Sequence, residues 1–69
     1  MATATVTAWR VVMATDGGAI RIMPVKTQAQ GEECAESVVG TETARGVIVS
    51  ASVEQSNGDG WQVVHYTEY

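Results

Sequence analysis

Apolar and polar residues alternate along four segments of the chain, a pattern typical of β-strands with one buried face. β-Branched and aromatic residues, which favour strands, are frequent in these segments. In the first segment Trp9, Val11 and Met13 fall on one face. The four predicted strands are residues 5–14, 19–25, 46–54 and 61–67.

The last predicted strand alternates from its first residue. The pattern places Trp61, Val63 and His65 on one face. It places Gln62, Val64 and Tyr66 on the other face.

Two glycine-containing segments divide the four strands into two hairpins. Residues 16–18 read Asp-Gly-Gly and residues 56–60 read Ser-Asn-Gly-Asp-Gly. Such segments supply the positive φ angles of tight turns at little steric cost. Pro24 cannot donate a ladder hydrogen bond, so we expect it at a strand end or on a sheet edge.

Between the hairpins the apolar period changes to that of a helix, predicted over residues 29–39. Thr27 and Gln30 fit a capping box at its start, and Gly40 is the expected stop. Gly31 is the weak point of the helix. The apolar stripe consists of Cys34, Ala35, Val38 and Val39.

The predicted order is therefore strand, strand, helix, strand, strand, with residues 41–45 as a polar connection. The economical fold is α+β (ββαββ), in which one helix packs on one face of a four-stranded, mostly antiparallel sheet. Residues 1–69 form a single domain in this interpretation. The order of the strands within the sheet stays open.

Composition narrows the choice of compartment and partner. The chain has 69 residues and a net charge of −4, and its four basic residues are scattered singly, which disfavours direct binding of nucleic acid. Cys34 is the only cysteine, so no intrachain disulfide can form and we expect the reducing cytosol of a host cell. Residues 1–8 lack the basic start and apolar core of a signal peptide, and no stretch is long enough to span a membrane.

Catalytic chemistry is sparse. One cysteine and one histidine do not supply a metal site, and no phosphate-binding glycine motif precedes the helix. His65 is expected at the sheet surface and Cys34 in the core, although a small enzyme built on these two residues stays an open alternative. We therefore predict no catalytic, metal-binding or cofactor-binding residue, and a protein that is not an enzyme.

Acidic residues are the most suggestive group for binding. Glu32, Glu33 and Glu36 fall within the first turns of the predicted helix, where the helix dipole favours anions, and Glu42 follows closely. They form either a solvated helix face or a negative ridge that binds lysine and arginine, as nucleic-acid phosphates do. Glu32, Glu33, Glu36 and Glu42 are the predicted partner-binding acids.

The aromatic residues add a second candidate surface. A single helix covers only one face of a four-stranded sheet, and aromatic rings on the other face make good binding anchors. We expect Trp9 in the core, and Tyr66 and Tyr69 to be exposed. Tyr66 joins the four acids as a predicted partner-binding residue.

In length, order of elements and acidity, with turns at 16–18 and 57–60 and a helix at 29–39, the chain resembles small phage-encoded inhibitors. Among these it is similar to anti-CRISPR proteins that act on type I surveillance complexes. The resemblance involves no residue motif. It implies a phage or mobile-element protein that inhibits a host nucleoprotein complex by protein–protein binding, some members of the group occupying DNA-binding surfaces.

The alternative is a structural or assembly protein, such as a small virion component or a self-associating subunit. Residues 47–53 are the stretch expected to pair through an exposed strand edge.

Overall fold

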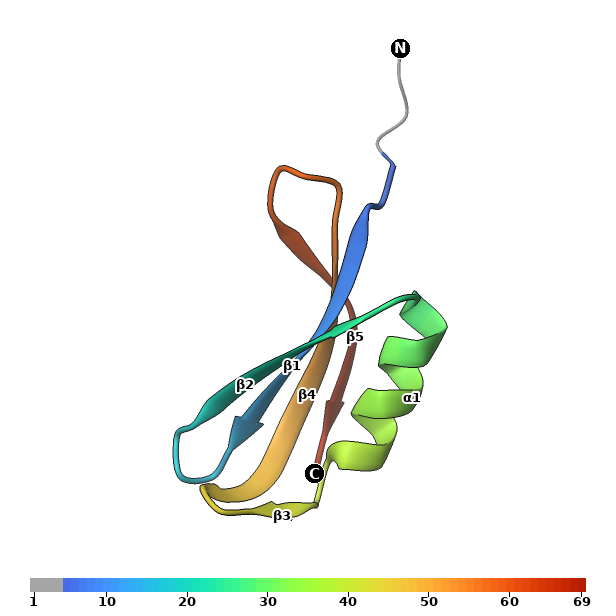
Figure 1. Ribbon diagram of the computed structural model, residues 1–69. Helices are drawn as coiled ribbons and strands as arrows, with labels where there is room; N and C mark the ends of the chain where they lie inside the picture. The colour runs from blue at the N-terminus through green and yellow to red at the C-terminus, as the bar shows by residue number, and fades with distance from the viewer. Residues whose placement is uncertain (1–4) are drawn as a thin grey trace.

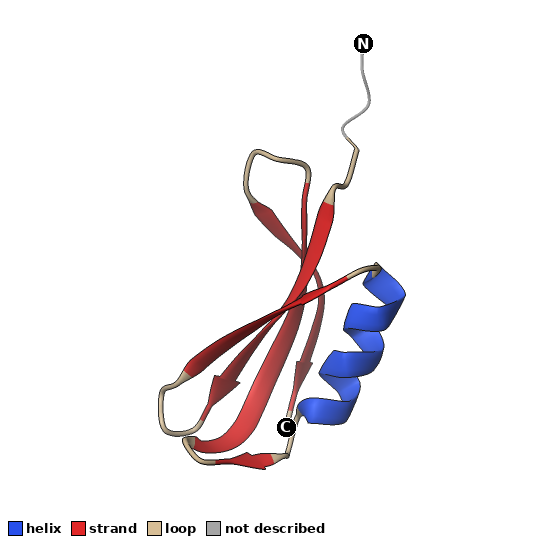
Figure 2. Ribbon diagram, in the orientation of Figure 1, coloured by secondary structure: helices blue, strands red, loops and turns tan. Residues whose placement is uncertain are grey.

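The computed structural model describes residues 5–69, in which one helix packs against one side of a twisted sheet (Figures 1 and 2). The elements are β1 (Ala8–Thr15), β2 (Ile20–Val25), α1 (Gln28–Val38), β3 (Glu42–Thr43), β4 (Gly46–Ser56) and β5 (Trp61–Glu68). The predicted α+β class is confirmed, and β3 adds a two-residue strand within the segment expected to be a connection. Residues 1–4, which belong to the segment judged not to be a signal peptide, lie outside the described residues.

The inner strands of the sheet are β1 and β4. β1 pairs with β2 and β4, and β4 also pairs with β3 and β5, all antiparallel. β2 is therefore an edge strand, which is where Pro24 was expected. The prediction that residues 47–53 offer a free edge is wrong, because β4 is paired along both of its sides.

The start and stop signals of α1 act as the sequence indicates. The Thr27 hydroxyl accepts the backbone N–H of Gln30 (3.1 Å), and the Gln30 side chain accepts that of Lys26 (2.9 Å), one residue before the cap. Beyond the C-cap Val39, Gly40 takes a φ of 91°, a left-handed angle that glycine adopts without strain.

The glutamates of α1 do not lie in its first turn. The helix begins at Gln28, so the first turn contains no acidic residue. Because the effect of the helix dipole falls off within that turn, the predicted dipole stabilisation of Glu32, Glu33 and Glu36 is wrong.

The core lies between α1 and the two inner strands. Val11, Ala51 and Val53 are fully buried on the sheet, and Ala35 is fully buried on the helix. A Cβ atom on Gly31 would lie 2.8 Å from a Val53 methyl, so the missing side chain of Gly31 allows α1 to sit directly on β4. Gly31, which weakens the helix locally, is thus required by the packing of α1 against β4.

Trp9 lies on the helix side of the sheet, as predicted, but it is only half-buried. The core cluster does not include it, because the pairing of Trp9 with Val25 and Gln55 places it near one end of the sheet. Its indole Nε1 is buried without a hydrogen-bond partner among the described residues. The predicted side of the sheet is therefore correct for Trp9, but the predicted burial in the core is wrong.

An irregularity in β5 changes which of its residues face the helix. Val53 pairs with His65 and the next residue, Glu54, pairs with Val63, so Val64 is the extra residue of a β-bulge. Beyond the bulge the alternation is reversed. The predicted grouping of His65 with Trp61 and Val63 is wrong: His65 faces the helix, and Tyr66 shares the opposite face with Trp61 and Val63.

Candidate functional site

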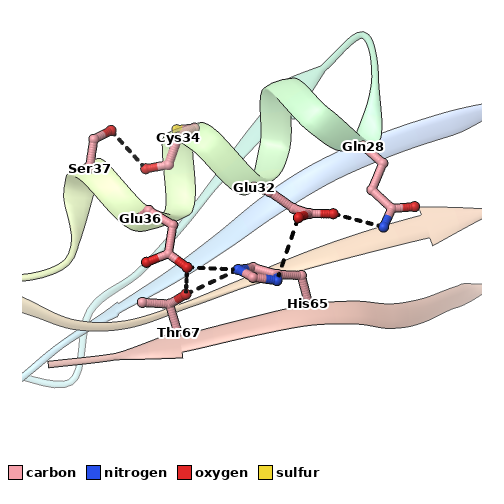
Figure 3. Close-up of polar contacts among 7 residues, drawn as sticks. All are labelled: Gln28, Glu32, Cys34, Glu36, Ser37, His65 and Thr67. Atoms are coloured by element: carbon pink, nitrogen blue, oxygen red, sulfur yellow. Dashed lines mark hydrogen bonds and ion pairs between the residues drawn. The ribbon is translucent and has the colours of Figure 1, made fainter.

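The predicted acidic residues do not form one continuous ridge. Glu32 and Glu36, one helical turn apart, both point toward β5 (Figure 3). Glu33 is exposed on α1, and it lies about a quarter of a turn around the helix from Glu32. Glu42 is exposed on β3, opposite Val47. Two acids therefore belong to a cluster with the sheet, and two stand free on the surface.

His65 lies between the two inward-turned glutamates. Its Nε2 is 3.1 Å from Glu36 Oε1, and its Nδ1 is 3.8 Å from Glu32 Oε1. The Thr67 hydroxyl donates to Glu36 Oε1 (3.0 Å) and lies 3.2 Å from His65 Nε2 (Figure 3). Gln28 donates to the other oxygen of Glu32 (2.9 Å). These five residues connect one side of α1 to β5.

The order of groups in this cluster can be compared with that of a catalytic triad. A hydroxyl, an imidazole and a carboxylate follow one another in the order Thr67, His65, Glu32, as in nucleophilic catalysis. However, the Thr67 hydroxyl donates its hydrogen bond to Glu36, and the 3.8 Å between His65 Nδ1 and Glu32 Oε1 exceeds hydrogen-bond length. The arrangement fastens the helix to the last strand.

Cys34 lies on the opposite side of α1 from Glu32 and Glu36 (Figure 3). It is half-buried and packs against the core, as predicted, and its burial raises the pKa of the thiol. A raised pKa leaves less of the reactive thiolate at neutral pH. The structure therefore separates the two residues that the enzyme hypothesis would combine.

The face of the sheet that α1 leaves open carries a set of exposed apolar residues. Strand pairing places them in two strips, one on each outer strand, β2 and β5. The exposed fractions are Ile20 63%, Ile22 53%, Trp61 42%, Val63 53% and Tyr66 57%. We call these five residues the open-face patch. Tyr66 is the one predicted binding residue that belongs to it.

An ion pair lies between the two strips. Arg10 on β1 contacts Glu54 on β4 with 2.7 Å between Nε and Oε1, and its guanidinium lies 4.0 Å from the centre of the Trp61 ring. This cation–π contact holds Trp61 against the sheet. The hydroxyl of Tyr66 donates to Glu68 (3.3 Å). The charges in the middle of the open face thus neutralise each other.

Only part of the open-face patch could be predicted from the sequence. The isoleucines of β2 share a face in any strand assignment, but nothing in their spacing shows which face the helix covers. Tyr66 joins Trp61 and Val63 only because of the bulge at Val64, which the alternation does not reveal. The opposed charges of Arg10 and Glu54 mark this face as solvent-accessible once the register is known.

Within residues 5–69, no three histidine, cysteine, aspartate or glutamate side chains are grouped as a metal site would require. No helix in the same part of the chain has the length and apolar character needed to cross a membrane. Comparisons with protein-family models, with curated proteins and with solved structures found no match to this chain.

Proposed function

We propose that this protein is a non-catalytic binding module whose open sheet face docks on another protein. The observation that carries the proposal is the position of the exposed apolar residues. Among residues 5–69, five of the six exposed large apolar residues, all except Tyr69, belong to the open-face patch. Clustered apolar and aromatic residues on one face are typical of protein interfaces.

The electrostatics of the face favour an apolar partner surface. Arg10 and Glu54 are paired at its centre, whereas Glu32 and Glu36 lie on the helix side of the sheet. A basic groove would find few unpaired acids on the open face. The partner surface that fits is apolar at its centre, with polar groups around the rim.

Inhibition of the partner is the activity proposed for such binding. A small protein that covers a working surface of a larger complex stops it without any chemistry of its own. The resemblance to anti-CRISPR proteins makes a host nucleoprotein complex, such as a type I CRISPR effector, the partner we propose. Exposed Glu33 and Glu42, which lie outside the open-face patch, add negative charge to the surface of the protein, and exposed carboxylates of this kind can stand in for nucleic-acid phosphates.

A pull-down from bacterial lysate containing a type I effector complex tests this function, with washes at low and high salt. In the open-face variant, Ile22→Ser with Tyr66→Ser, we expect at least tenfold less retained complex, because both side chains are exposed and removing them leaves the core intact. In the charge variant, Glu33→Lys with Glu42→Lys, retention at high salt should change less than twofold, because exposed charge contacts are screened.

Circular dichroism provides the control that both variants keep the wild-type fold. Loss of binding in the charge variant alone would replace open-face docking with charge docking. If the wild-type protein retains no effector complex, the proposed inhibition of that complex is wrong.

Self-association is the second candidate, because the open-face patch and the outer edges of β2 and β5 could also meet a second copy of the chain. A molecular size that rises with concentration, and that returns to that of a monomer in the open-face variant, would favour a structural or assembly role.

A further inference from the structure

A second site lies on the helix side of the sheet, beyond the part that α1 covers. A cavity of about 330 Å³ opens there, between the turn that joins β1 to β2 and the turn that joins β3 to β4. Its apolar lining includes Met13, Ile48 and Ile20, the first two of which belong to the buried core. No residue of α1 lines this cavity. An opening onto core side chains gives an apolar ligand a surface to bury.

Two arginines line the same cavity. Arg21 comes from β2 and Arg45 from the turn before β4. They are two of the four basic residues in a chain of net charge −4. Among the described residues, neither takes part in a salt bridge, in contrast to Arg10, which pairs with Glu54. Unpaired guanidinium groups beside an apolar lining suit a ligand that combines a carboxylate with an aliphatic group.

The two turns are fastened to each other. The Thr15 hydroxyl donates to the carbonyl of Arg45 (3.1 Å), whose own N–H donates to the Thr43 hydroxyl (3.1 Å). Asp16 and Val47 exchange two further hydrogen bonds, 3.0 Å and 3.1 Å long. The backbone that carries Arg45 is therefore held in place before any ligand arrives, which lowers the entropic cost of binding.

We propose that this cavity binds a segment of a partner protein in which an acidic residue adjoins an aliphatic one. The aliphatic side chain fills the space over Met13 and Ile48, and the carboxylate accepts hydrogen bonds from Arg21 and Arg45. A nucleic-acid backbone fits less well, because it offers no apolar group for the lining and is repelled by the net charge. The site shares Ile20 with the open-face patch but differs from it in its two arginines and in its opening onto Met13 and Ile48.

Small probes test the chemistry directly. Hexanoate, hexanol and acetate are titrated separately into the full chain, and the methyl signals of Met13, Ile20 and Ile48 are followed by NMR. Hexanoate combines both features of the proposed ligand, so it should bind at least tenfold more tightly than either other probe. Equal affinity for hexanol would show that the arginines do not recognise the carboxylate, which would overturn the proposal.

Peptides and an oligonucleotide test which class of macromolecule the cavity recognises. A capped tripeptide with aspartate between two leucines should shift the same methyl signals, and its asparagine counterpart should bind at least tenfold more weakly. A single-stranded oligonucleotide should leave these signals unchanged. If the oligonucleotide shifts them and the aspartate peptide does not, the site recognises nucleic acid and the proposal is wrong.

Arginine variants test whether hexanoate binds in this cavity. Arg21→Gln and Arg45→Gln should each weaken hexanoate binding about tenfold, and because both side chains are exposed, the fold should be unaffected. Lys26→Gln removes the same charge at a position outside the cavity lining and should change the affinity less than twofold. If the lysine variant weakens binding as much as the arginine variants, net charge alone explains the binding and the site assignment fails.

Discussion

Both faces of the sheet carry apolar residues, but only the face under α1 buries them. On the covered face, Val11, Ala51 and Val53 are fully buried, and α1 approaches so closely that position 31 has room only for glycine. On the open face, Ile20 and Ile22 keep more than half of their surface exposed. The comparison teaches that hydrophobicity alone does not select the buried face of a strand.

The charged pair on the two inner strands, Arg10 and Glu54, lies on the open face and explains the choice. Arg10 and Glu54 lie opposite each other on β1 and β4 and keep 26% and 16% of their side-chain surface exposed, and a helix packed over them would remove this remaining contact with water. The helix therefore covers the other face, and the isoleucines of β2 stay exposed because the register with β1 puts them on the charged side.

The largest contrast is expected from the same substitution on the two faces. Val53→Ala should lower the free energy of unfolding by about 2–3 kcal/mol, because it removes a fully buried side chain and leaves a cavity. Val63→Ala on the open face should change it by less than about 0.5 kcal/mol. Urea unfolding measures both, and equal effects would mean that the open face is packed against something in solution.

Gly31 tests how close α1 lies to the covered face. Gly31→Ala should destabilise the protein by about 1 kcal/mol, because overpacking against Val53 costs about 1–3 kcal/mol and outweighs a gain of roughly 1 kcal/mol in helix propensity. Ala29→Gly, at an exposed position of the same helix, should cost about 1 kcal/mol through propensity alone. A stabilised Gly31→Ala protein would show that α1 lies farther from β4 than the structure places it.

The cluster around His65 contributes less, since its side chains are partly exposed. Glu36→Gln should lower the free energy of unfolding by about 0.5 kcal/mol, because the Glu36 side chain is 60% exposed and its contacts with His65 and Thr67 are screened by solvent. Glu33→Gln, at an exposed position of the same helix outside the cluster around His65, should have almost no effect. The difference should shrink in 1 M salt, and a difference that is independent of salt would argue against an ionic contact.

The smallest expected effect on stability comes from the thiol of Cys34, which lies at the edge of the core. Burial raises the pKa of its thiol in the folded state, so the unfolded chain loses the thiol proton at a lower pH than the folded chain. Stability from this group is therefore present at neutral pH and should decline as the pH rises above about 8.5. Cys34→Ala should remove that decline, and the folded wild type should react with a thiol reagent more slowly than the urea-unfolded chain.

Local signals in the sequence defined the elements well. The alternation in residues 46–54 predicted β4, and Asp16-Gly17-Gly18 marked the first turn. Thr27 and Gln30 marked the start of α1 to within one residue. These features depend on near neighbours in the chain, through hydrogen bonds across a turn or the two-residue period of a strand, and each can be read from a short window.

The candidate sites were harder to predict, because each joins residues that are distant in sequence. Glu32 and Glu36 were expected on a free acidic ridge, and the packing of α1 against β5 brought them to His65 instead. Arg21 and Arg45 were counted as scattered charges, and the contact between two turns brought them to one cavity.

By itself, the sequence determined the α+β order of elements, the turns and the helix cap, all of which follow from local pattern. Only the tertiary structure decided which face of β2 is covered, since that depends on register with the charged pair Arg10 and Glu54. The bulge at Val64 likewise set the directions of His65 and Tyr66. A bulge adds one residue to a strand, and this single addition moves every later side chain to the opposite face.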